Sequence, residues 1–179
     1  MSGLAIEVAL VDPRWGEGFS YIEALCRRAA LAAFAVAGLV PAAGLELSIL
    51  LAADTELRRL NREFRGIDKA TNVLAFPGED VGEDASGRRL LGDVALGYET
   101  VCREAREGEI SASDHFAHLV IHGCLHLAGY DHHEDVDAVR MEAAEVDALA
   151  RLGRPDPYNS EAAAPAPQMA GPVPRQTVR

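Results

Sequence analysis

The segment HGCLHLAGYDH, residues 122–132, spaces three histidines in a way that strongly constrains the local fold. Residues four apart on a helix lie one above the other, so His122 and His126 are predicted to share one helix face. A glycine just beyond a helix can adopt a positive φ without a Cβ penalty, and Gly129 occupies such a position. We therefore predict a helix that ends in a chain reversal at Gly129, which brings His132 toward the other two histidines.

This histidine spacing predicts a metal site. Three imidazoles around an open coordination position are typical of catalytic zinc sites, whereas structural zinc sites usually include cysteine. We therefore predict one Zn²⁺ ion per chain, with His122, His126 and His132 as its ligands. The next residue, His133, is an alternative third ligand. Asp131 either shapes the turn or orients a ligating imidazole by a hydrogen bond. For two histidines upstream on the same helix we expect a structural role: His115 and His118.

The spacing H-x3-H-x2-G-x2-H also occurs in metzincin peptidases, which carry a glutamate directly after the first histidine. This chain has Gly123 at that position, so the usual base for peptide hydrolysis is absent. Glycine inside a helix costs about 1 kcal/mol relative to alanine, which suggests that substrate or another backbone approaches closely at this point. A small zinc peptidase is kept as an alternative.

The charge of the chain argues against a nucleic-acid binder with a broadly basic surface. Its 179 residues include 17 Lys and Arg against 28 Asp and Glu, a net charge of −11. A phosphate site must therefore be local, and residues 58–70 are the most basic stretch. Three of its arginines are interpreted as a solvated helix face: Arg58, Arg59 and Arg62. Arg65, Lys69 and Asn72 are predicted to contact the substrate, with turn capping as the alternative role for Asn72.

Hydrophobic periodicity predicts an α/β (α+β) fold with one domain over residues 1–154. Strands are predicted over 4–11, 45–53, 71–76 and 90–97, and helices over 18–36, 54–64, 98–107, 111–128 and 134–152. They should form a mixed four-stranded sheet packed with about five helices, with the metal site at the end of the histidine-bearing helix. Asp54 is predicted to cap its own helix, and Ser111 with Asp114 resembles a capping box. Residues 155–179 form a Pro/Ala-rich tail that we expect to be disordered.

Cysteine usage and hydropathy bear on location. The chain has three widely spaced cysteines, too few and too scattered for a disulfide framework or a thiolate metal cage. No apolar run approaches the 18 or so residues of a membrane span, and the first residues lack the pattern of an export signal. We therefore expect a cytoplasmic protein that does not associate with membranes.

Three sequence blocks together resemble the YbeY endoribonucleases, bacterial zinc-dependent enzymes of ribosomal RNA maturation. The blocks are HGCLHLAGYDH (122–132), LNREFRGIDKATNVLAFP (60–77) and LLGDVALGYE (90–99). The resemblance implies a single α/β domain, a metal bound by the three histidines, and a functional arginine at Arg65. It makes Arg65 and His122 the predicted catalytic residues. The family often has Tyr, Lys, Pro and Ser where this chain has Phe64, Ile67, Ala70 and Ala75.

The function implied by the resemblance is single-strand-specific, metal-dependent cleavage of ribosomal RNA. It is associated with maturation of the small-subunit rRNA 3′ end and with ribosome quality control, and small-subunit ribosomal proteins are expected partners. A zinc-bound water has a pKa of about 7, which would supply hydroxide at neutral pH. The sequence leaves open whether water or the RNA 2′-hydroxyl attacks. Besides the peptidase, a non-catalytic zinc-containing ribosome assembly factor is the other alternative.

Overall fold

Four strands form one mixed sheet in the order β1-β2-β4-β3. They belong to a computed structural model that describes residues 4–39, 45–78 and 89–159. The strands are β1 (Ala5–Leu10), β2 (Leu45–Ala52), β3 (Val73–Pro77) and β4 (Arg89–Gly97). β1, β2 and β4 run parallel, and β3 pairs antiparallel with β4. The predicted mixed four-stranded sheet is thereby confirmed.

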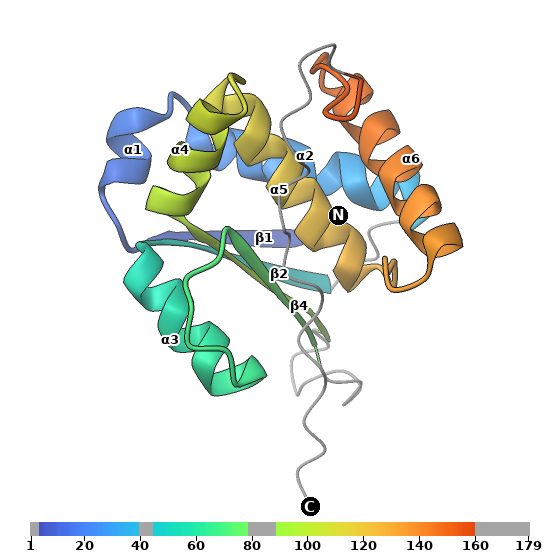
Figure 1. Ribbon diagram of the computed structural model, residues 1–179. Coiled ribbons are helices and arrows are strands. Elements are labelled where there is room, and N and C mark those ends of the chain that lie inside the picture. The colour runs from blue at the N-terminus through green and yellow to red at the C-terminus, as the bar shows by residue number, and fades with distance from the viewer. Residues whose placement is uncertain (1–3, 40–44, 79–88, 160–179) are drawn as a thin grey trace, which may run out of the picture.

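Helices cover both faces of the sheet, but unequally (Figure 1). The described ranges contain α1 (Arg14–Gly18), α2 (Ile22–Val36), α3 (Asp54–Arg65), α4 (Tyr98–Glu107), α5 (Ala112–Leu127) and α6 (Asp135–Arg151). Helix α3 lies alone below the sheet, while α5 packs on the other face with α2 and α6 around it. The larger core therefore lies between the sheet and α5. A smaller cluster including Leu57, Leu74 and Ala95 lies between α3 and the sheet.

The helix predicted over 18–36 is present as α2, but it begins at Ile22, and a short helix that the sequence did not predict, α1, precedes it. Tyr21 separates them with a positive φ of 57°. Trp15 explains the early turn of α1: its side chain is fully buried, and its indole N–H donates to the carbonyl of Ala52 at 3.0 Å. A buried indole needs such a partner, which here lies at the end of β2. The periodicity of α2 gave no sign of this contact.

Helix α5 is buried on all sides from His115 to Leu127. Gly123 is the point of closest approach to the sheet, since a Cβ there would lie 2.7 Å from Cγ1 of Val94 and 3.4 Å from Cγ2 of Val73. The predicted close approach at Gly123 is present. The approaching groups are valine side chains of β3 and β4, however, rather than substrate or another backbone.

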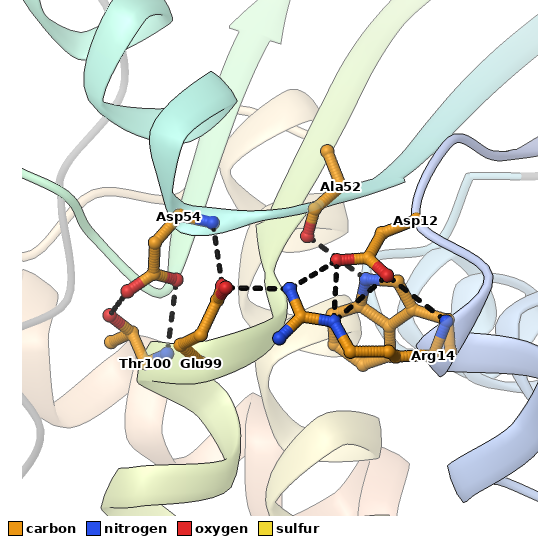
Figure 2. A network of polar contacts seen from close by, with 7 residues as sticks. Asp12, Arg14, Ala52, Asp54, Glu99 and Thr100 are labelled. Atoms are coloured by element: carbon orange, nitrogen blue, oxygen red, sulfur yellow. Dashed lines mark hydrogen bonds and ion pairs between the residues drawn. The ribbon is translucent and has the colours of Figure 1, made fainter.

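At the carboxyl ends of the parallel strands, five polar residues form what we call the strand-end network (Figure 2): Asp12, Arg14, Asp54, Glu99 and Thr100. The Arg14 guanidinium donates to Glu99 at 2.6 Å and, through Nε, to both oxygens of Asp12 at 3.0 Å. The prediction that Asp54 caps its own helix was wrong. Its carboxylate instead accepts the backbone N–H and the hydroxyl of Thr100, at 3.0 and 2.6 Å, in the first turn of α4. In return, Glu99 accepts the Asp54 N–H at 2.8 Å, so each helix caps the other.

The predicted capping box at the start of α5 was also wrong. Ser111 occupies the N-cap position, but its side chain makes no capping hydrogen bond. The Asp114 carboxylate is paired with Arg154 beyond α6, which also donates to Ser113 Oγ at 3.1 Å. A charged donor forms a stronger hydrogen bond than a backbone N–H, and this ion pair ties the two helices together.

The predicted domain limit at residue 154 and the tail over 155–179 stay predictions, because residues 160–179 lie outside the described residues. Residues 155–159 are described, and Tyr158 contacts α5 and α6.

Candidate metal centre

Three histidines meet where α5 ends, and we call them the histidine centre: His122, His126 and His132. One nitrogen of each lies within 4.8 Å of the others. The ring centroids are 4.5 Å apart for His122 and His126, 5.0 Å for His126 and His132, and 5.5 Å for His122 and His132. Gly129 has a φ of +90°, and the Tyr130 N–H donates back to the Leu125 carbonyl at 3.0 Å. The chain reversal therefore forms at the glycine that the sequence indicated.

Hydrogen bonds fix which nitrogen of each helical imidazole carries the proton. His122 Nδ1 lies 2.6 Å from Glu145 Oε1, and His126 Nδ1 lies 2.9 Å from the Tyr130 carbonyl oxygen. An ionised carboxylate and a carbonyl can only accept, so both Nδ1 atoms must donate. In the neutral rings, both Nε2 atoms then carry lone pairs. These two atoms face each other at 3.0 Å.

The surroundings keep these imidazoles neutral. Burial lowers the pKa of His122, outweighing the opposite influence of Glu145. Burial, followed by the neighbouring imidazoles of His122 and His132, lowers the pKa of His126 to about 3. In two neutral rings whose Nδ1 atoms carry the protons, no proton lies between the two Nε2 atoms, and their lone pairs face each other. This close approach is unfavourable unless a cation lies beside both atoms.

The third histidine completes the case for a metal. His132 Nε2 is buried and has no hydrogen-bond partner among the described residues. Buried polar atoms are nearly always satisfied, so an unpartnered imidazole nitrogen in a group of three close histidines fits a metal ligand. An all-imidazole donor set suits zinc and also nickel, copper or iron. The histidine centre can therefore hold a metal ion, and no second such group occurs within the described ranges.

Glu145 of α6 is a residue of this centre that the sequence analysis missed. Its side chain is buried, and its two oxygens accept from His122 Nδ1 at 2.6 Å and from His118 Nε2 at 2.7 Å. Burial alone would raise the pKa of Glu145, but hydrogen bonds from His118 and His122 hold it below its ordinary value. Such a carboxylate behind a ligating histidine fixes its tautomer and orientation. A single acidic residue on the otherwise apolar face of Met141, Ala144, Ala148 and Leu149 was the available signal.

The remaining histidines and Asp131 lie outside the ligand set. His115 is buried and bonded to Glu104 at 2.8 Å, which agrees with the structural role expected for it. His133 is exposed and lies 3.4 Å from Asp131, so His132 rather than His133 joins the centre. Asp131 accepts the backbone N–H of His132 at 2.7 Å. Of the two roles considered for Asp131, it performs the turn-shaping one.

The predicted substrate residues come from the end of α3 and the segment that follows it, and none belongs to the group of three histidines. Arg65 is the last residue of α3, on the opposite face of the sheet from α5 (Figure 1). Within the described ranges, its guanidinium makes one long contact, 3.4 Å from Nη1 to Asn61 Oδ1. The exposed Lys69 side chain has no ion-pair partner among the described residues. Asn72 is buried, donates to Glu104 at 3.0 Å and accepts the Val73 N–H at 2.7 Å. Their roles toward a substrate stay predictions.

Most of the basic stretch is locally neutralised. Arg58 pairs with Asp68 at 2.8 Å, and Arg59 pairs with Glu56 and Glu63 at 2.8 and 2.5 Å. Exposed pairs of this kind contribute little to stability, in agreement with a solvated helix face. Arg65 and Lys69 are thus the cations of this stretch that remain without a carboxylate in the described structure.

The described ranges also bear on two features that the sequence was not expected to contain, a membrane-spanning helix and disulfide bonds. No helix there combines the length and the hydropathy needed to cross a bilayer. All three cysteines are free, and burial raises the pKa of Cys26 to about 12.

Fold and donor set together define a class: α/β proteins with an all-histidine metal site at the end of a buried helix. A family model described as endoribonuclease YbeY matches residues 21–153. The protein named endoribonuclease YbeY from Paramagnetospirillum magneticum is 45% identical over 162 residues, covering 88% of this chain and 98% of the relative. The one from Sphingopyxis alaskensis is 45% identical over 165 residues, covering 87% and 97%. This chain belongs to the endoribonuclease YbeY family, as its three motifs predicted.

A solved structure agrees with the fold. The solution structure of a Thermotoga maritima protein covers 87% of this chain and 99% of its own, with a TM-score of 0.50. Sequence identity is 23%, so this likeness concerns the fold alone.

Proposed function

We propose that this protein is a zinc-dependent endoribonuclease that cleaves single-stranded ribosomal RNA in the cytoplasm. Its proposed task is maturation of the small-subunit rRNA 3′ end and ribosome quality control, with small-subunit ribosomal proteins as partners. The observation that carries the proposal is the histidine centre, in which nitrogens of three imidazoles converge and Nε2 of His132 has no hydrogen-bond partner among the described residues. Relatives 45% identical over almost their whole length carry the name endoribonuclease.

Each site residue has a defined part in the proposed reaction. Glu145 and the Tyr130 carbonyl hold the Nδ1–H groups of His122 and His126, so both Nε2 atoms are available as ligands. A bound zinc ion supplies hydroxide at neutral pH and polarises a phosphoryl oxygen. Arg65 is proposed to hold a phosphate of the RNA, because a guanidinium without a carboxylate partner is free to bind an oxyanion. Lys69 adds positive charge on the same segment, and Asn72 is proposed to position the strand entrance beside it.

Two observations favour this function over the alternatives. A side chain at position 123 would point into Val94, so a glutamate there, as in the peptidases, has no room. The centre contains three imidazoles and no thiolate among the described residues, which leaves a coordination position open as catalysis requires. A purely structural zinc site would be closed by a fourth protein ligand.

Elemental analysis combined with RNA cleavage tests the proposal. We expect about one zinc per chain and cleavage of an unstructured ribosomal RNA fragment that stops with a chelator and returns with zinc. Digestion of casein in place of RNA would favour the peptidase. Cleavage that persists in metal-free protein would refute the proposed mechanism, and a metal-loaded protein without nuclease activity would favour the assembly factor.

The proposed role of Arg65 has a matched control in Arg62, an exposed arginine of the same helix. Arg65→Ala should reduce the rate of RNA cleavage by at least about tenfold, since one charge-assisted phosphate contact is worth about 1.5–3 kcal/mol. Zinc content should not change, and Arg62→Ala should cleave nearly as fast as the parent. Equal loss in both variants would show that Arg65 supplies only general positive charge.

A further inference from the structure

Tyr158, which follows α6, reaches the carboxylate behind the metal ligand His122. Its hydroxyl donates to Glu145 Oε2, the oxygen that also accepts from His118. The Tyr158 and His118 rings are in edge contact, with centroids 5.6 Å apart. Tyr158 lies outside the residues that the family model matches, 21–153.

Glu145 could turn freely if only His122 held it, because a glutamate side chain has three rotatable bonds. Instead, Oε2 is held by His118 from α5 and by Tyr158 from the C-terminal segment, which leaves Oε1 aimed at His122 Nδ1. Three donors from two elements thus converge on one buried carboxylate. Side chains whose rotamers are fixed in this way hold a ligand in its binding orientation before the ion arrives.

We infer that Tyr158 and Glu145 are positioning residues of the metal site, through which the segment after α6 sets the affinity of the histidine centre for its ion. The chain of contacts runs from the Tyr158 hydroxyl through the Glu145 carboxylate to the His122 imidazole. Neither residue contacts the ion or the substrate in this arrangement. The inference rests on the proposed metal site but not on the identity of the RNA.

A simple packing role for Tyr158 predicts a different outcome. Its side chain is partly exposed, with 37% of the residue accessible, so loss of one hydroxyl removes little buried surface. Packing alone would therefore leave both the folded structure and metal binding almost unchanged. The positioning role predicts weaker metal binding in Tyr158→Phe, whereas a purely structural contact predicts lower stability of the metal-free protein with an unchanged zinc Kd.

The test is a zinc titration of the full chain in competition with a chromophoric chelator. Tyr158→Phe should raise the zinc Kd about threefold to tenfold, the equivalent of one hydrogen bond. Glu145→Gln should raise it about 10- to 100-fold, as is typical when the partner of a ligating histidine is lost. Visible absorption of the cobalt-substituted protein should also change in both variants, since the orientation of His122 changes.

Two control variants separate this contact from general effects. Tyr21→Phe removes a hydroxyl from a tyrosine that is 87% exposed, and it should bind zinc like the parent. Glu142→Gln removes an exposed charge of α6 that acts on Tyr158 through space without a hydrogen bond, and it should also leave the Kd unchanged. Urea unfolding of each metal-free variant measures stability separately.

An unchanged zinc Kd in Tyr158→Phe would overturn the inference, whatever Glu145→Gln shows. If Glu145→Gln fails to fold, Tyr158→Phe still decides the matter because its position is partly exposed. Failure of the proposed function has a different signature: the parent would bind zinc without cleaving RNA, while the difference in Kd between parent and Tyr158→Phe would remain measurable.

Discussion

The histidine centre and the strand-end network are both clusters of polar side chains built against one sheet, but they differ in how their atoms are satisfied. In the network, all six carboxylate oxygens of Asp12, Asp54 and Glu99 have donors within the protein. In the centre, the Nδ1 atoms of His122 and His126 are satisfied, whereas their Nε2 atoms face each other, and Nε2 of His132 has no hydrogen-bond partner in the described ranges. A cluster in which every acceptor has a donor within the protein indicates a structural role. An incomplete set of hydrogen bonds indicates a place for a ligand.

Removing one imidazole of the histidine centre should have the largest effect on function. His126→Ala should lower zinc affinity by more than about a hundredfold and reduce RNA cleavage to background, since two remaining ligands cannot hold the ion in a three-histidine site. Metal content and cleavage rate are the measurements. His133→Ala is the control, because His133 is exposed and outside the centre. A His126→Ala protein that retains its zinc would place the metal elsewhere.

The histidine centre and the strand-end network should affect the free energy of unfolding in different ranges of acidic pH. The folded pKa of His126 is about 3, mainly because of burial, against about 6.5 in an unfolded chain. Between these values only the unfolded chain binds the proton, so the free energy of unfolding decreases as pH falls from about 6.5 toward 3. The network contributes later: Arg14 holds the pKa of Asp12 below 3.8, and that stabilisation is lost only in more acidic solution.

Urea midpoints of chelator-treated protein measure this dependence. They should decrease steadily between about pH 6.5 and pH 4 and change little between about pH 7 and pH 8. A midpoint that stays constant down to about pH 4 would mean that His126 is not buried as a neutral ring.

Breaking the strand-end network should affect stability alone. Asp54→Ala removes the acceptor of two hydrogen bonds from Thr100 in the first turn of α4, and the loss should cost about 1–2 kcal/mol of unfolding free energy. Zinc affinity should stay at the parent value. Asp137→Ala, at an exposed position in the first turn of α6 without such a bond, is the matched control. Weaker zinc binding in Asp54→Ala would show that the two clusters are coupled.

The smallest effect is expected for Gly123→Ala, which tests the contact of α5 with the sheet. The new methyl group would meet Val94 at 2.7 Å, and overpacking of this kind costs about 1–3 kcal/mol. Alanine returns about 1 kcal/mol through its helix propensity, so a net destabilisation of about 1 kcal/mol is expected in urea unfolding. A more stable variant would mean that α5 can move from the sheet without cost.

The sequence was most informative where a structural rule acts over a few residues. The spacing of His122, His126 and Gly129 sufficed to predict the helix, the turn and the convergence of the histidines, because each step depends on the i to i+4 geometry and on a single glycine. The order of hydrophobic segments likewise predicted all four strands. Tertiary partners decided the remaining features, and local patterns do not encode them.

The errors share that physical cause. Asp54 and Asp114 were expected to cap the helices in which they lie, but their carboxylates bind Thr100 and Arg154, which lie 46 and 40 positions away in sequence. The Trp15 indole N–H anchors α1 by donating to a carbonyl of β2. Glu145 could be found only as an acid on an apolar helix face, since its partners lie on another helix.

The exchange of caps between α3 and α4 has a consequence for how the chain is assembled. The carboxylates of Asp54 and Glu99 accept from amides 46 and 45 positions distant, so a peptide containing either helix alone lacks the carboxylate that caps it. During synthesis, the beginning of α3 lacks this cap until β4 has paired with β2 and Glu99 is in place. The first turns of the two helices are therefore expected to become fully ordered together.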